Sequence, residues 1–321
     1  MRAMQVLYTV DTELSLMMQL RGRTPEDNYR SAILGETSRG AFGIPHQLDR
    51  LDAHGLKGVF FVEALHTATI GDDMLKRIVD LIATRGHEVQ LHCHIEWLWF
   101  HDGAMRLPRE KQSLTHLTLA EQTELLGIAK TALERAGVRP TAFRAGNYGA
   151  NDDTVKALAS LGIAWDSSYN RTSADSHIDV DPATIRPVLR DGVVEVPVSW
   201  FMDRPGSARH AQLCAASAGE FAHALNRAHA AAHPLFTIVS HSFELLNRAR
   251  TRPHPLVVRR FERLCEMLAA APAATVGFRD LDARKLTRHG PVSPIRSNLA
   301  RTGLRMAEQA IGNFLYEREA A

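Results

Sequence analysis

Short apolar runs of strand length alternate with amphipathic stretches of helical length along most of this chain. The apolar runs are residues 5–10, 59–62, 88–92, 141–144, 163–166, 193–198, 235–240 and 275–278. Strands that are separated by helices favour parallel β/α units, because parallel neighbours need a crossover connection. Seven or so units precede Asp280, so we expect a distorted or incomplete (β/α) barrel. A doubly wound open sheet is the main alternative, since periodicity does not distinguish the two.

Two helices in the middle of the chain have clear boundary residues. Thr118 and Glu121 have the spacing of a capping box, and Gly137 follows the predicted helix as a stop signal. Asn151 is a favourable N-cap for the next helix, which ends at Gly162. These signals place whole helices between the predicted strands.

Two segments depart from the alternation. Residues 14–43 show no clear period, and a segment of that length inside a compact domain is usually functional or mobile, so we interpret it as a candidate lid. Residues 284–321 are basic at first and then carry apolar side chains at helical spacing. We therefore expect a barrel over residues 1–283 and a C-terminal helical tail over 284–321, which packs on the barrel or forms a homo-oligomer.

Composition excludes several classes of partner. The chain has 321 residues, and its 38 basic and 36 acidic side chains give a net charge of only +2, which gives no reason to expect nucleic acid or an anionic membrane. The start of the chain is soon polar, and no apolar window is long enough to span a bilayer. Three cysteines do not indicate a disulfide framework. The expected location is the cytoplasm.

Polar side chains with catalytic or metal-binding potential stand where the predicted strands end. They are Asp11, Glu13, His92, Arg144, Asp166 and His241. Each could by itself be a helix cap, a surface ion pair or a hydrogen-bonded core residue. Together, carboxylates, imidazoles and a guanidinium at five strand ends favour a metal-assisted hydrolase, because the carboxyl ends of parallel strands meet on one face of the fold.

The spacing of these residues offers a metal shell with two possible geometries. Asp11 and Glu13 provide two carboxylates, so that one can bind a metal ion while the other remains a base. If a helical turn follows the third strand, His92 and Glu96 share a face. If the backbone stays extended, His92 and His94 share one instead. Two nitrogens with one carboxylate, or one nitrogen with two carboxylates, suit zinc and similar ions.

Several segments resemble, in order and spacing, the motifs of polysaccharide deacetylases of the NodB-homology type, carbohydrate esterase family four. The resemblance covers roughly residues 4–282. It rests on Gly43-Ile44-Pro45, Gly58-Val59-Phe60-Phe61-Val62, Gly86-His87-Glu88-Val89-Gln90-Leu91-His92, Phe143-Arg144-Ala145-Gly146, Asp166-Ser167-Ser168 and Val239-Ser240-His241.

This resemblance implies a distorted barrel and metal-dependent hydrolysis of an acetyl group from an N-acetylated sugar. It implies that Asp11 is the general base toward the attacking water and that His241 is the general acid. Arg144 would orient Asp11. The expected cofactor is a divalent metal ion, and zinc is the expected identity.

The chain departs from the family pattern in the metal shell. Thr12 stands where the family commonly has a second aspartate, and Asp11-x-Glu13 is similar to a variant in which Glu13 is the metal carboxylate. Glu96 stands where the family has its second histidine. We therefore expect Glu13, His92 and Glu96 as ligands, with His94 as the alternative to Glu96.

The substrate side of the site has fewer signals. Trp97 directly follows the metal motif and could contact a sugar ring, or it could be core at a strand–helix junction. Asp166 is also expected beside the substrate. The resulting hypothesis is a hydrolase of the carbon–nitrogen amide bond in an acetylated sugar or polysaccharide precursor. The alternatives are an allantoinase-like hydrolase of cyclic amides or imides, and a catalytically retired sugar-binding or assembly protein.

Overall fold

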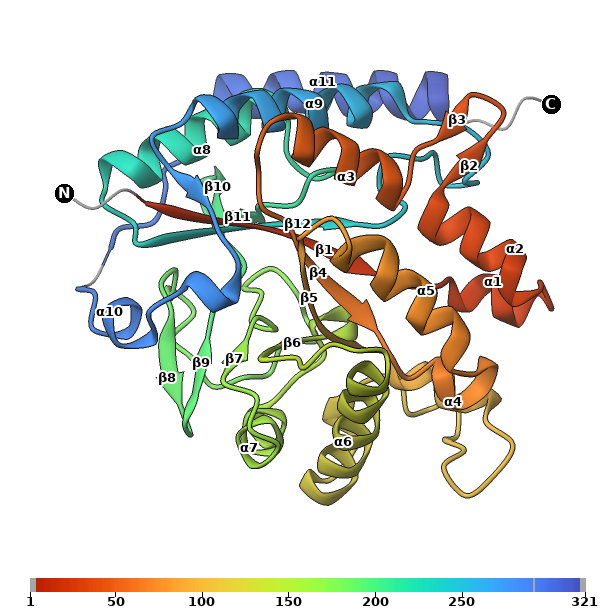
Figure 1. The fold of residues 1–321 in the computed structure, drawn as a ribbon. Coiled ribbons are helices and arrows are strands. Elements are labelled where there is room, and N and C mark those ends of the chain that lie inside the picture. Colours follow the sequence, from red (N-terminus) through yellow and green to blue (C-terminus); the bar gives the residue numbers. More distant parts are fainter. Residues whose placement is uncertain (1–3, 291, 318–321) are drawn as a thin grey trace.

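A curled and largely parallel sheet forms the centre of the fold (Figure 1). The computed structural model describes residues 4–290 and 292–317. The strands that pair in parallel are β1 (Gln5–Thr12), β4 (Val59–Glu63), β5 (Glu88–Cys93), β6 (Ala142–Ala145), β7 (Trp165–Asp166), β9 (Val193–Glu195), β12 (Leu235–His241) and β13 (Ala274–Thr275). These strands match the eight apolar runs of the sequence, and most differ from them by only a few residues at the ends.

The sheet is an incomplete barrel, as the sequence predicts. Its strand order is β12-β1-β4-β5-β6-β7-β9-β8, and β13 pairs with β1 beside this path. The last strand, β8 (Val188–Arg190), is antiparallel to β9. No pairing joins β8 to β12 within the described residues, so the curled sheet stays open on that side.

Helices follow most of the parallel strands and cover the outside of the sheet (Figure 1). They are α3 (Ile44–Ala53), α4 (Thr67–Ile70), α5 (Asp72–Ala83), α6 (Leu119–Arg135), α7 (Asp152–Ser160), α8 (Ala218–Ala230) and α9 (Pro255–Ala270). The capping box of Thr118 with Glu121 is present at the start of α6. Asn151 caps α7, and Thr154 completes a second box there.

The alternation of side chains along β1 shows how the fold separates its core from its polar face. Tyr8 and Val10 pack into the large apolar cluster under the helices. Leu7 packs into a smaller cluster inside the curled sheet, together with Phe61 and other apolar side chains. Because successive strand residues point to opposite faces, Asp11 belongs to the same inner face as Leu7. The inner face is therefore apolar toward the start of β1 and polar at its end.

Residues 14–43 are more regular than the sequence suggests. They form α1 (Leu16–Leu20), α2 (Pro25–Asn28), a π-helical turn (Tyr29–Leu34) and a hairpin of β2 (Glu36–Thr37) and β3 (Gly40–Ala41). The side chains of Tyr29 and Ile33 are buried in the main core. The segment is therefore packed at its centre, and its role as a lid stays a prediction.

A second hairpin and the chain's last helices complete the fold. The sequence did not predict the hairpin of β10 (Trp200–Arg204) and β11 (Ser207–His210). Residues 284–321 contribute most of α10 (Ala283–Thr287) and α11 (Leu299–Tyr316). The buried Arg305 of α11 forms ion pairs with Asp203 of β10 at 2.8 Å and with Glu220 of α8 at 3.1 Å. These contacts attach the tail helix to the barrel.

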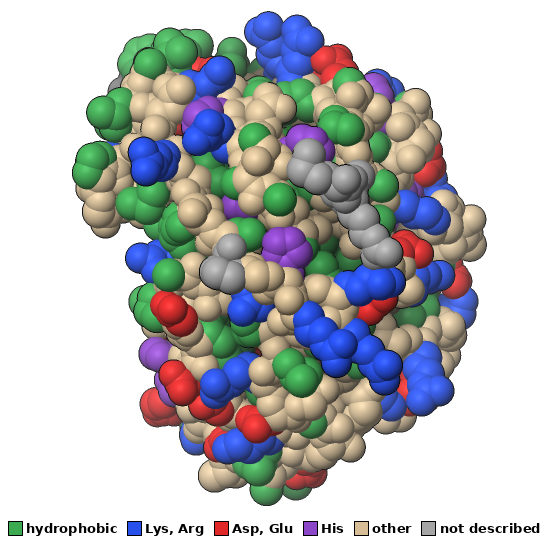
Figure 2. All heavy atoms as spheres, turned by 90° about the vertical axis from the view of Figure 1, so that its left-hand side faces the viewer, with side chains coloured by type: hydrophobic (Ala, Val, Ile, Leu, Met, Phe, Trp, Pro, Cys, Tyr) green, Lys and Arg blue, Asp and Glu red, His purple; other side chains and the backbone are tan. Residues whose placement is uncertain are grey.

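The outer face of α11 is apolar and exposed. Hydrophobic side chains gather at the upper left of Figure 2, where the solvent-facing side of this helix lies. The large exposed side chains of α11 are Leu299, Leu304, Met306, Ile311, Phe314 and Leu315. No helix in the described part of the chain is both long enough and apolar enough to cross a membrane.

Candidate metal and catalytic site

The carboxyl end of β1 supplies the two carboxylates of the site. Asp11 and Glu13 are two residues apart on extended backbone, so both side chains point to the inner face of the sheet. Asp11 lies directly opposite His241 in the β1–β12 register. On the other side of β1, the pairing with β4 and then β5 leads to His92. The sheet therefore gathers residues that are far apart in sequence.

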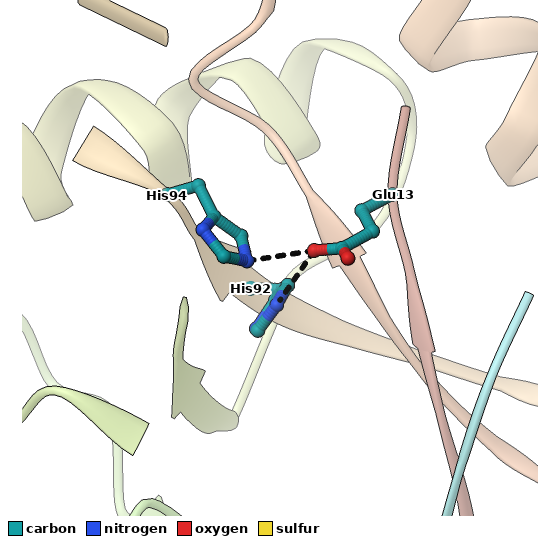
Figure 3. Close-up of side chains that lie close together, drawn as sticks. All are labelled: Glu13, His92 and His94. Carbon is teal, nitrogen blue, oxygen red and sulfur yellow. Dashed lines mark ion pairs between the residues drawn. The ribbon is translucent and has the colours of Figure 1, made fainter. Parts of the chain in front are cut away.

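Glu13, His92 and His94 converge on one point (Figure 3). The Oε2 atom of Glu13 is 2.7 Å from Nε2 of His94 and 3.5 Å from Nε2 of His92. The two imidazole rings come from the end of β5 and stand nearly perpendicular, with centroids 5.0 Å apart. Their ligand atoms all lie within 4.8 Å of one another, which is close enough for one ion to contact all three.

In each imidazole, the Nδ1 atom faces a hydrogen-bond acceptor other than Glu13. Nδ1 of His92 donates a hydrogen bond to the backbone carbonyl of Arg144 at 2.7 Å. Nδ1 of His94 donates to Oε2 of Glu96 at 3.3 Å. A ring nitrogen that donates a hydrogen bond carries the proton, so the lone pair of a neutral ring is on Nε2, facing Glu13. Such outer partners are typical of histidine ligands, because they fix the ring and its tautomer.

The electrostatics of this cluster also fit a cation. Burial disfavours charge on Glu13, but His94 and His92 hold the pKa of this carboxyl well below its usual value. Burial likewise opposes charge on His94, yet Glu13 and Glu96 raise the pKa of this imidazole well above its usual value. The cluster thus stabilises a positive charge between its carboxylates. Two imidazoles and one carboxylate are a donor set that zinc and related ions accept.

Glu96 lies outside this cluster, which differs from the ligand set favoured by the sequence. Residues 95–100 form a 3-10 helix after the strand, and His94 is still extended, so His92 and His94 share a face. Glu96 faces the opposite nitrogen of His94, and its Oε1 atom accepts from Nδ2 of Asn147 at 3.2 Å. The backbone stays extended through His94 and does not turn into a helix directly after His92. His94, rather than Glu96, therefore lies beside His92 and Glu13.

Gly146 allows the loop after β6 to pass directly against His94. A Cβ atom on Gly146 would lie 2.6 Å from Nδ1 of this imidazole, which is closer than real contacts allow. The next residues, Asn147 and Tyr148, both have positive φ, of 54° and 61°. Side chains rarely adopt this backbone conformation, so the loop is strained beside the cluster.

Arg144 crosses the inside of the sheet to reach Asp11. Its side chain is fully buried, and its Nη1 atom donates to Oδ1 of Asp11 at 2.7 Å and to the hydroxyl of Thr9 at 2.8 Å. Nε and Nη2 donate to the carbonyl and hydroxyl of Ser167, both at 3.1 Å. The guanidinium also lies 4.4 Å from the ring centroid of Phe61. Arg144 therefore holds the carboxylate of Asp11 by a buried ion pair.

His241 faces Asp11 on one side and a buried carboxylate on the other. Its Nε2 atom is 4.0 Å from Oδ2 of Asp11, and its Nδ1 atom donates to Oε2 of Glu244 at 3.1 Å. Oε1 of Glu244 accepts from the backbone of Cys214 at 2.7 Å and from Gln212 at 3.1 Å. Burial opposes charge on His241, but Glu244 and Asp11 raise the pKa of the imidazole to about 9. His241 is therefore protonated at neutral pH.

Two residues expected beside the substrate are buried instead. Trp97 is only 1% exposed and packs in the main core, with its ring 5.9 Å from His66. Its burial agrees with the alternative that it is core. Asp166 is fully buried and accepts from Ser168 at 2.5 Å. Burial raises the pKa of Asp166 to about 6, and the neighbouring Glu195 is also buried. Neither side chain presents a surface to a substrate in this structure.

The middle of the sequence is similar to a known family. Residues 41–165, fewer than half of the 321 residues, match the family described as polysaccharide deacetylase. The matched segment contains His92, His94 and Arg144, but it contains neither the end of β1 nor His241.

Two solved structures have a similar fold. A Mycobacterium smegmatis protein classed as a polysaccharide deacetylase is 22% identical with a TM-score of 0.55, and the match covers 93% of this chain and 96% of that one. The 4-alpha-glucanotransferase of Thermococcus litoralis is 10% identical with a TM-score of 0.55, over 93% of this chain but only 42% of that one. At these identities the likeness shows the fold alone. No curated protein sequence matches the chain.

The structure also adds residues that sequence reasoning missed. Glu244 accepts a hydrogen bond from Nδ1 of His241, and the hydroxyls of Thr9 and Ser167 accept hydrogen bonds from the guanidinium of Arg144. A signal for Glu244 was available, because it follows His241 by three residues and the strand ends between them. No local pattern marks Thr9 or Ser167, since their partner lies on another strand.

Proposed function

We propose that this protein is a metal-dependent hydrolase that removes an acetyl group from the amide nitrogen of a sugar or polysaccharide precursor. The observation that carries the proposal is the placement of Asp11 between Arg144 and His241, beside the cluster of Glu13, His92 and His94. A base, an acid and a metal-binding set thus share one edge of the sheet. The match of residues 41–165 to the polysaccharide deacetylase family supports the same chemistry.

Glu13, His92 and His94 are the proposed metal ligands, and zinc is the proposed ion. The donor set supports this assignment, because Nε2 of both rings and Oε2 of Glu13 face a common point. When bound, the ion would polarise the amide carbonyl and favour deprotonation of the attacking water. Glu96 would then influence metal binding indirectly, because its hydrogen bond orients the ring of His94.

Asp11 and His241 would divide the proton transfers between them. Asp11 accepts a proton from the water whose oxygen attacks the acetyl carbonyl carbon. Arg144 keeps the carboxylate in place and stabilises its charge before the transfer. His241 then donates its Nε2 proton to the amide nitrogen as the carbon–nitrogen bond breaks. The products are acetate and a sugar with a free amine.

Release of acetate from N-acetylhexosamine compounds tests this function. We expect release by the zinc-loaded protein and its loss in the Asp11→Asn variant. Ring opening of cyclic ureides without release of acetate would favour the allantoinase-like alternative. Metal-free protein that binds glycans without turnover would favour the retired sugar-binding alternative.

We also propose that the exposed apolar face of α11 pairs two copies of the chain. Support comes from six large apolar side chains on one helix that are each at least half exposed, which is unusual for a monomer. The Leu304→Glu variant should shift the mass in light scattering from dimer to monomer. A wild-type protein that is monomeric at high concentration would contradict the proposal.

A cytoplasmic location remains part of the proposal. The three cysteines, Cys93, Cys214 and Cys265, are free, which agrees with a reducing compartment. Fractionation of cells that express the tagged protein would test the location, and recovery outside the cytoplasm would contradict it.

A further inference from the structure

Arg250 places a guanidinium beside the loop that carries His241. It lies in the segment between β12 and α9, and its guanidinium carbon is 4.0 Å from the ring centroid of Phe243. The ring of Phe243 is in turn 5.5 Å from that of His241. Arg250 has a φ of +57°, so the backbone holds this side chain in a strained conformation. A cation is therefore positioned next to the general acid.

Within the described residues, the guanidinium of Arg250 contacts the ring of Phe243 but has no carboxylate partner. Its guanidinium makes no hydrogen bond or ion pair there, and the Nη1 atom is buried without an acceptor. Burial lowers the pKa of Arg250, while the nearby charge of Glu13 opposes the shift. By contrast, the buried Arg144 uses all its nitrogens in hydrogen bonds. A half-buried charge without a counter-ion costs stability, so such an arrangement is expected where it serves binding.

Arg250 lines a cavity of about 590 Å³ between this loop and α11. Each of the three carboxylates in its wall already accepts a hydrogen bond. Oε2 of Glu308 accepts from Arg260 at 2.9 Å, and Oε2 of Glu317 accepts from the backbone of Arg248 at 2.8 Å. Glu244 accepts from the backbone of Cys214 and from Nδ1 of His241. The wall carries three carboxylates and three guanidiniums, and Arg250 is a guanidinium there without a carboxylate partner among the described residues, so an anion would bind at Arg250 rather than throughout the cavity.

We propose that the acetylated sugar carries a negatively charged group, a phosphate or a carboxylate, and that Arg250 binds this group in the cavity beside His241. The proposal rests on the function proposed above, because it names the substrate class of the same site. A metal ion on Glu13 would offset the negative charge of this carboxylate, which acts on Arg250. An anionic substituent on the substrate would restore the balance of charge and orient the acetamide toward His241.

Calorimetry with the Asp11→Asn variant tests the proposal without relying on turnover. The probes are N-acetylglucosamine, its 1-phosphate and its uronic acid, which separate a phosphate from a carboxylate. We expect one charged sugar to bind at least about tenfold more tightly than the neutral sugar, as a charge-assisted hydrogen bond would give. Adding Arg250→Gln should remove this preference, and Arg250→Lys should restore part of it. The matched control, Arg259→Gln on the exposed side of α9, should leave the preference intact.

Two results would overturn the inference. One is equal or absent binding of neutral and charged sugars, and the other is a preference that survives Arg250→Gln. Either can occur while the wild-type protein still releases acetate, in which case only the inference about the anion fails. Charge-dependent binding that requires Arg250, in a protein that releases no acetate from any probe, would support the anion site and reject the hydrolase function.

Discussion

The metal half and the proton-transfer half of the site are held in place in different ways. In the metal half, the carboxylate of Glu13 contacts only His92 and His94 among the described residues. In the proton-transfer half, Asp11 is bound by the buried Arg144, and His241 is bound by the buried Glu244. We infer that the ion itself would complete the first half, whereas the protein alone preorganises the second. The two halves should therefore respond differently to substitution.

The Glu13→Ala variant should show the largest effect, because it removes the carboxylate of the metal half. We expect the protein to lose its metal and release of acetate to fall to background. Metal content by mass spectrometry and an acetate assay check this. Glu124→Ala, at an exposed glutamate of α6, is the control and should change neither. Full activity in Glu13→Ala would remove Glu13 from the site.

Asp11→Asn should separate the two halves. Loss of the base should lower kcat by about 10²- to 10⁴-fold, while the metal content stays at the wild-type level. The asparagine can still accept a hydrogen bond from Arg144, so the fold should be kept. If the variant loses its metal instead, then Asp11 and Glu13 have their roles exchanged.

Gly146→Ala tests whether the loop against His94 maintains the metal half. The added methyl group would collide with the imidazole, so His94 should move and metal affinity should fall by about 10- to 100-fold, as for a disturbed ligand shell. Titration with zinc measures the change. Gly303→Ala is a suitable control, because a Cβ there meets open space. Unchanged affinity would show that His94 tolerates displacement.

Glu244→Gln should give the smallest effect, confined to the proton-transfer half. The pKa of His241 is raised to about 9, so the acid is protonated below that pH and activity should fall as the pH rises through it. In the variant the pKa should move toward its ordinary value of about 6.5, and the basic limb of the rate profile should move with it. A profile of kcat against pH at constant metal content checks this. If the basic limb of the profile does not move, then a group other than His241 determines it.

The same change has a consequence for stability. A raised histidine pKa stabilises the fold fully below the pKa of the unfolded chain, and this stabilisation is lost as the pH rises through about 9. Glu244→Gln should therefore lower the thermal midpoint at pH 6 more than at pH 10.

The fold was more predictable than the site's ligand set. Alternating strand and helix patterns, with capping residues such as Thr118 and Asn151, identified the parallel strands and the incomplete barrel. The sequence did not predict the β10–β11 hairpin, and residues 14–43 show no clear period in it because their elements are too short.

The site depended on geometry that the sequence left open. Whether His94 or Glu96 joins His92 depends on one residue of strand length after β5, and strand ends are the least certain part of a pattern. Trp97 follows the motif in sequence, but the 3-10 helix turns it into the core. The resemblance implies that Arg144 orients Asp11, but no pattern in the sequence indicates its contact with Thr9, since the curled sheet brings β6 toward β1 across two intervening strands.

The metal content of His94→Ala and Glu96→Gln, measured side by side by mass spectrometry after saturation with zinc and removal of excess ion, tests the central claim most directly. We predict one zinc ion for each wild-type chain, none in His94→Ala, and a bound but weaker ion in Glu96→Gln. Retention of zinc by His94→Ala together with its complete loss in Glu96→Gln would contradict the ligand set of Glu13, His92 and His94.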